Sequence, residues 1–185
     1  MLDNACMGVL TTPDLLTVEE FAKLPDPAGA RLELRHGEPV AVTFPAREHR
    51  EILFQTFRLL DRCHPDKMVR PELAFRPSID HELWAADIGV FTREQDRASS
   101  QSKWLVGAPE IVVEVVSPSN TPDELEDRER TCFAGGAREF WVIYLTSRHV
   151  KVSRADGTTA RYGAGEAIPT GKGTIAVNDI FEILD

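Results

Sequence analysis

Two acidic residues stand inside segments that are otherwise apolar. Glu114 interrupts the run IVVEVV, and Asp87 lies within AADIGV. An ionised carboxylate is costly to bury without a partner, so each residue needs a cation, a metal ion or water beside it. Placed on neighbouring strands, the pair could hold one Mg²⁺, which prefers oxygen ligands and keeps several waters. The alternatives are a solvent-facing edge strand for Glu114 and a strand end or turn for Asp87.

Four further residues have side chains capable of chemistry. Glu33 and Glu38 flank a predicted hairpin, where either could add an outer carboxylate, although a glutamate there is usually solvated. His49 opens a predicted helix, where the role of a general base competes with that of a cap or surface residue. Cys132 lies late in a charged helix and has no histidine near it in sequence, which favours core packing over a nucleophilic role.

Apolar periodicity predicts one mixed α/β domain that positions these residues. We expect residues 1–15 to form a flexible leader and residues 16–185 to form a single domain. The spacing predicts helices over 17–24, 47–63 and 122–133, with a final helical turn over 180–184. It predicts strands over 31–35, 39–44, 84–91, 111–116, 139–145, 150–153, 160–162 and 174–177, and one or two short strands over 68–76. The polar segment 93–104 is expected to be a mobile loop.

Composition narrows the classes of protein that fit. The chain has 185 residues and a net charge of −9, which argues against a general nucleic-acid coat because nonspecific affinity comes from neutralising phosphates. Its cations are 16 Arg and 5 Lys. Three distant cysteines without CxxC spacing favour a reducing compartment over a disulfide framework. No apolar run approaches a membrane span and no signal peptide is recognised, so a cytoplasmic location is expected.

The order of the segments resembles a known family. The chain has TVEEF, RLELRHGE, a helix opened by histidine, a strand with aspartate, APEIVVEVVSPSN, and an acidic helix leading into AREFWVIYL. From about Leu16 to Leu184, this succession is similar to the Uma-family "putative restriction endonucleases" of the PD-(D/E)XK nuclease-like superfamily. The combination of APEIVVEVVSPSN with GAREFWV carries most of the resemblance.

The resemblance implies a fold and a set of site residues. The fold is α/β, a restriction-endonuclease-like mixed sheet core with flanking helices and added antiparallel hairpins. The metal ligands fall on Asp87 and Glu114, the hairpin glutamate on Glu33 with Glu38 at the second position, and the helix-start histidine on His49. The implied cofactor is Mg²⁺ or Mn²⁺. The implied partner is nucleic acid, with DNA favoured, and the resemblance allows a homodimer.

Three positions depart from the family pattern. Ala86 replaces the proline before the aspartate, and Val116 stands two residues after Glu114, where lysine is usual. The resemblance implies that this lysine is displaced to the following helix, where the present chain has Arg128. Arginine stays protonated and cannot act as a base, but it binds phosphate in bidentate fashion. The alternative for Arg128 is a surface ion pair with Glu124.

Three functions therefore remain open. The first is a Mg²⁺-dependent endonuclease in which Asp87 and Glu114 bind the metal and Arg128 contacts phosphate, with activity weakened by loss of the lysine. The second is a catalytically inactive nuclease-fold protein that binds nucleic acid or protein. The third is an acidic interaction module. Three arginines that share one face of the 47–63 helix favour phosphate contact, although an ordinary solvated helix face would have the same pattern.

Overall fold

The computed structural model describes residues 15–78, 80–116 and 120–184, so most of the predicted leader lies outside the described residues. The helices are α1 (Val18–Phe21), α2 (Arg47–Cys63), α3 (Arg93–Ala98), α4 (Pro122–Ala134) and α5 (Val177–Phe181), followed by a 3₁₀ turn, η1 (Glu182–Leu184). The strands are β1 (Ala30–Arg35), β2 (Glu38–Thr43), β3 (Met68–Arg76), β4 (Trp84–Phe91), β5 (Leu105–Val106), β6 (Ile111–Val115), β7 (Glu139–Tyr144), β8 (His149–Arg154), β9 (Thr159–Tyr162), β10 (Ala167–Thr170) and β11 (Gly173–Ala176).

Seven strands form the central sheet in the order β5-β3-β4-β6-β7-β8-β9. Strand β6 is in the middle, as its β-branched sequence predicts for a strand covered on both faces. It runs parallel to β7, to which α4 connects it, and antiparallel to β4. The predicted α/β class, with a mixed sheet, flanking helices and added hairpins, is confirmed.

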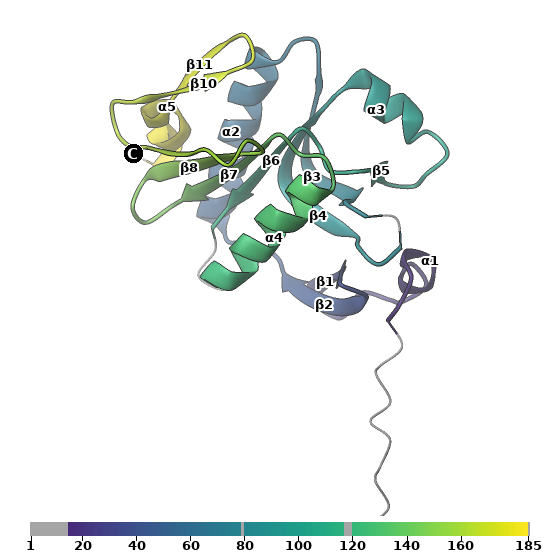
Figure 1. The fold of residues 1–185 in the computed structure, drawn as a ribbon. Coiled ribbons are helices and arrows are strands. Elements are labelled where there is room, and N and C mark those ends of the chain that lie inside the picture. Colours follow the sequence, from purple (N-terminus) through teal and green to yellow (C-terminus); the bar gives the residue numbers. More distant parts are fainter. Residues whose placement is uncertain (1–14, 79, 117–119, 185) are drawn as a thin grey trace, which may run out of the picture.

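Helices cover both faces of this sheet. Figure 1 shows α4 crossing one face, while α2 lies against the other face beside α5. Along β6 the side chains alternate between these layers. Ile111, Val113 and Val115 join the core with α2 and α5, whereas Val112 joins the core with Cys132 of α4. The same alternation directs Glu114 toward the α4 layer.

A separate hairpin, β1–β2, lies below the sheet near the first turns of α4 (Figure 1). Its turn is His36-Gly37, with φ values of 51° and 78°. Leu34 of β1 is fully buried, and its backbone pairs with Leu83 just before β4. Because successive residues of a strand face opposite sides, burial of Leu34 directs its neighbour Glu33 the other way, toward the sheet.

The local structure differs from expectation in one helix and two short strands. Residues 93–98 form helix α3 rather than a loop, because the Thr92 hydroxyl caps the Gln95 amide and the Gln95 side chain donates to the carbonyls of Val106 and Ala108. Two short strands were not predicted, namely β5, which pairs with β3, and β10, which pairs with β11. In the described ranges, no helix has the length and apolar character needed to cross a membrane.

Candidate active site

A cavity of about 820 Å³ lies where the β1–β2 hairpin, the starts of α2 and α4, and strands β4 and β6 meet. This volume is within the range of small-molecule sites in proteins. Five of the six predicted site residues line the cavity: Glu33, His49, Asp87, Glu114 and Arg128. The sixth, Glu38, lies exposed on β2 and is not among the lining residues.

Asp87 and Glu114 lie where β4 and β6 part. The ladder between these strands ends at the pair Ile88–Val113, and Asp87 and Glu114 are the next residues on each strand. Beyond that point the Val115 amide donates to Asp87 Oδ2 over 2.7 Å, so a carboxylate replaces a backbone acceptor. The two carboxylates therefore lie on neighbouring strands, which is the condition under which the sequence allowed them to share one metal ion.

Arg128 connects the carboxylates of two strands. From α4, Nη1 donates to Glu33 Oε2 over 3.0 Å, and Nη2 donates to Glu114 Oε1 and to the Ala85 carbonyl, each over 2.9 Å. The guanidinium carbon lies 5.0 Å from the centre of the Trp84 ring, a cation–π arrangement. Arg128 is 5% exposed. The alternative of a surface ion pair with Glu124 is therefore wrong.

The buried charges shift the proton affinities of the site. Burial raises the pKa of Glu114 to about 7, with Asp87 and Glu33 adding to the rise and Arg128 opposing it. Burial also acts to raise the pKa of Glu33, but the charges of Arg128 and Arg35 outweigh it and hold that pKa below its usual value. The lowered pKa favours the ionised form of Glu33, whereas burial favours the protonated form of Glu114.

His49, in the first turn of α2, contacts the Asp87 carboxylate. Its Nε2 lies 3.1 Å from Asp87 Oδ2, and the residue is only 6% exposed. Burial acts to lower the pKa of His49, but the hydrogen bond to Asp87 and its charge raise the pKa overall. The opposite ring atom, Nδ1, is buried without a hydrogen-bond partner in the described part of the chain, as is Arg128 Nε. Buried polar atoms without partners are rare and often occur at sites that take a ligand or water.

The donor set fits a hard divalent cation with substrate oxygens. Within the described ranges, Asp87 Oδ1 and Glu114 Oε2 make no hydrogen bond, so one oxygen of each carboxylate remains available. The same ranges hold no group of three or more His, Cys, Asp or Glu side chains arranged to bind a metal. Mg²⁺ is commonly bound by one or two carboxylates together with waters and phosphate, so two protein ligands suffice.

Other lining residues were not singled out from the sequence. Arg35 donates from Nε and Nη2 to Glu33 Oε2, and Arg31 Nη2 lies 3.8 Å from Glu33 Oε1. The alternation Arg31-Glu33-Arg35 was the available signal, since residues two apart on a strand share a side. Glu72 also lines the cavity, in the left-handed region with a φ of 48°. For Cys132, full burial against the sheet confirms the predicted core position.

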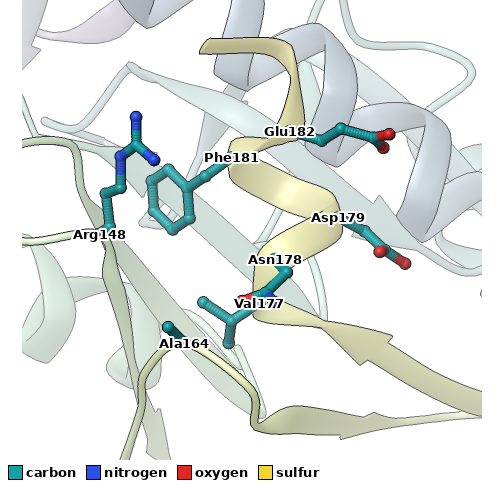
Figure 2. Close-up of a pocket in the computed structure, with 7 residues that line it drawn as sticks. All are labelled: Arg148, Ala164, Val177, Asn178, Asp179, Phe181 and Glu182. Carbon is teal, nitrogen blue, oxygen red and sulfur yellow. The ribbon is translucent and has the colours of Figure 1, made fainter. Parts of the chain in front are cut away.

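A second hollow, of about 480 Å³, lies against α5. Figure 2 shows Arg148 beside the ring of Phe181, while the carboxylates of Asp179 and Glu182 point away from both. The acidic groups do not converge there. The chemistry expected from the sequence therefore belongs to the first cavity.

Comparison with known proteins identifies a family and a similar fold. The model of the Uma2 family, described as "Putative restriction endonuclease", matches residues 18–180. The chain belongs to this family. A crystal structure of a "putative nuclease belonging to DUF820" from Anabaena variabilis has a similar fold, with a TM-score of 0.80 and 19% sequence identity over 91% of this Uma2 chain and 99% of that chain. No curated protein matches.

Proposed function

We propose that this Uma2 protein is a divalent-metal-dependent endonuclease that hydrolyses phosphodiester bonds of nucleic acid, with DNA as the expected substrate and Mg²⁺ or Mn²⁺ as the expected ion. The observation that carries the proposal is the meeting of Asp87 and Glu114 at the parting of β4 and β6, inside a cavity lined by arginines. Membership of a restriction-endonuclease family and the nuclease-like fold support the same class of reaction.

Asp87 and Glu114 are the residues proposed to hold the ion. When bound, a divalent ion lowers the pKa of water and stabilises charge on phosphate oxygens. The Val115 amide and His49 fix the orientation of Asp87. A cation beside Glu114 favours its ionised form, so binding is expected to displace the proton that this buried residue retains near neutral pH.

Arg128 is proposed to act as a positioning residue. Its Nη1 donates to Glu33, and its Nη2 donates to Glu114 and the Ala85 carbonyl, so Arg128 orients the two carboxylates and keeps a positive charge beside them. As an arginine, it cannot accept a proton from water. Arg31 and Arg35 also line the cavity and are more exposed than Arg128, with 31% and 17% of their side chains exposed, and they are proposed to contact phosphate.

Cleavage of labelled DNA in Mg²⁺ or Mn²⁺ tests the proposal. Asp87→Asn keeps the shape of the side chain and removes its charge, and we expect it to abolish cleavage. His49→Gln removes only an orienting contact and should reduce the rate by about 10- to 100-fold. Glu38→Gln, an exposed change outside the cavity, is the matched control and should cleave like wild type. Metal-dependent cleavage that is equal in wild type and Asp87→Asn would refute the assignment.

The ion pairs of Arg128 also favour a second candidate function. A guanidinium that already neutralises Glu33 and Glu114 stabilises the site without a metal, as a non-catalytic binding protein would require. In that case nucleic acid binds with strong salt dependence and remains intact when Mg²⁺ or Mn²⁺ is added. The same cleavage experiment, accompanied by a binding titration, separates the two functions.

A further inference from the structure

An exposed phenylalanine stands at the mouth of the cavity. Phe44 directly follows β2, lines the cavity and is 64% exposed. Val40 and Val42 of β2 line the cavity too, and they lie opposite Glu33 and Arg31 of β1. The cavity thus combines an apolar wall from β2 with the carboxylates of β4 and β6.

The acidic centre is recessed behind this wall. The side chains of Asp87 and Glu114 are each 13% exposed, and that of Arg128 is 6% exposed. A phosphate must therefore enter the cavity to reach them. In a duplex the faces of the bases are covered by stacking, so an aromatic side chain can cover a base face only when that base is unpaired or flipped out.

Basic and aromatic side chains continue from this mouth along α2. Arg47, Arg50, Phe54 and Arg58 follow one another at steps of three or four residues, which places them on one side of the helix. All four are exposed, including 86% of the Arg47 side chain and 45% of Phe54. Arg47 also pairs with Glu51, and Arg58 donates to the Phe54 carbonyl. This stripe spans about 16 Å, since a helix rises about 1.5 Å per residue.

The stripe combines charge with aromatic surface in the way that single-stranded nucleic acid requires. Arginines contact successive phosphates, and exposed aromatic rings stack on bases without reading their sequence. Helix α2 has four arginines against Glu48, Glu51 and Asp61, a formal charge of +1, whereas the chain as a whole carries a net charge of −9. The stripe begins next to Pro45 and Ala46, which line the cavity, and it therefore leads to the acidic centre.

We propose that the protein binds an unpaired segment of a nucleic-acid strand, with one base stacked on Phe44 and the neighbouring phosphates along the Arg47–Arg58 face of α2. The inference rests on the proposed nuclease function and specifies the form of its substrate. A strand held in this way places a backbone phosphate inside the cavity while its base covers the apolar wall.

Fluorescence anisotropy with a labelled single-stranded oligodeoxynucleotide tests the inference. Binding is measured in Ca²⁺, which occupies oxygen ligands, and a denaturing gel verifies that the probe stays intact. We expect Phe44→Leu to weaken binding by about 5- to 150-fold and Phe44→Trp, which retains a stacking ring, to preserve it. The double change Arg47→Gln, Arg50→Gln should reduce the slope of log affinity against log salt by about 1.4. Arg138→Gln changes an arginine that is not part of the stripe and has 76% of its side chain exposed, and it should change neither.

Two results would overturn the inference. One is equal affinity for the single strand and a blunt duplex of the same sequence, and the other is unchanged binding by Phe44→Leu. Failure of the nuclease proposal has a different signature, because strand binding would then depend on Phe44 while no cleavage occurs. Conversely, if duplex is cleaved by Phe44→Leu as by wild type but not by Asp87→Asn, the nuclease proposal is supported and only the inference is refuted.

Discussion

Replacement of Arg128 by methionine should destabilise the protein by an amount that depends on pH. Arg128 is buried, and the change leaves its partners without its charge. Glu33 keeps the pair with Arg35 at 2.9 Å, so Glu114 is the carboxylate that loses its cation. Removing one partner of a buried ion pair costs about 3–5 kcal/mol, and we expect this loss at about pH 8, where Glu114 is mostly ionised in wild type.

Protonation of Glu114 relieves part of that cost. Arg128 acts to lower the pKa of Glu114, which burial brings to about 7 in the intact site, so the pKa should rise further in the variant. At about pH 5.5 Glu114 is protonated in both proteins, and the destabilisation should decrease by up to about 1.4 kcal/mol for each pKa unit between them.

Urea unfolding followed by tryptophan fluorescence measures the free energy of unfolding of wild type and Arg128→Met at about pH 8 and at about pH 5.5. Arg130→Met is the matched control, since Arg130 lies on the same helix with 75% of its side chain exposed. Its effect should be within about 0.5 kcal/mol at either pH. A cost for Arg128→Met below about 1 kcal/mol, or one that does not change with pH, would refute the assignment of Arg128 as the buried partner of Glu114.

Three further predictions follow from other contacts. Glu114 must lose its proton to bind a metal, so the apparent affinity for Mn²⁺ should rise with pH up to about 7 and then level off. Calorimetry in buffers of different ionisation enthalpy should detect the released proton below this pH and no proton release above it. The hydrogen bond that His36 Nε2 donates to Asp127 Oδ2 raises the pKa of His36. This contact therefore stabilises the fold below the unfolded pKa of about 6.5, and the stabilisation is lost as pH rises through the folded pKa. His36→Asn should flatten that part of the stability profile in urea titrations. Gly135→Ala would place a Cβ 2.8 Å from the Pro77 carbonyl oxygen, so we expect destabilisation on the order of 1–3 kcal/mol in thermal melts.

The strands that carry the acidic pair could be predicted because their sequences have strong local patterns. Six-residue apolar runs around Glu114 and Asp87 predict strands irrespective of the rest of the chain. Helix α3 was missed because its sequence is polar and its support comes from the Gln95 side chain reaching backbone carbonyls beyond the helix. Strand β10 is four residues long and contains Pro169, which lowers its strand propensity.

The site was predicted in its residues but not in its connections. The spacing of α4 allowed a local pair between Arg128 and Glu124, whereas the observed partner Glu33 is 95 residues away. Such a contact depends on how the β1–β2 hairpin docks against the sheet, which periodicity does not encode. His49 was weighed as a cap or surface residue for the same reason, and its burial against Asp87 follows from the packing of α2. The catalytic and metal-binding roles of these residues remain predictions.

Titration of Mn²⁺ into the protein by calorimetry tests the central claim most directly, because it requires no choice of nucleic-acid substrate. Wild type and Glu38→Gln should bind the ion with the same affinity. Asp87→Asn and the double change Asp87→Asn, Glu114→Gln should lose binding. The unfolding midpoint of each variant is measured in parallel to verify that it is folded. If folded Asp87→Asn binds Mn²⁺ as tightly as wild type, the two carboxylates do not form the metal site and the proposed mechanism is contradicted.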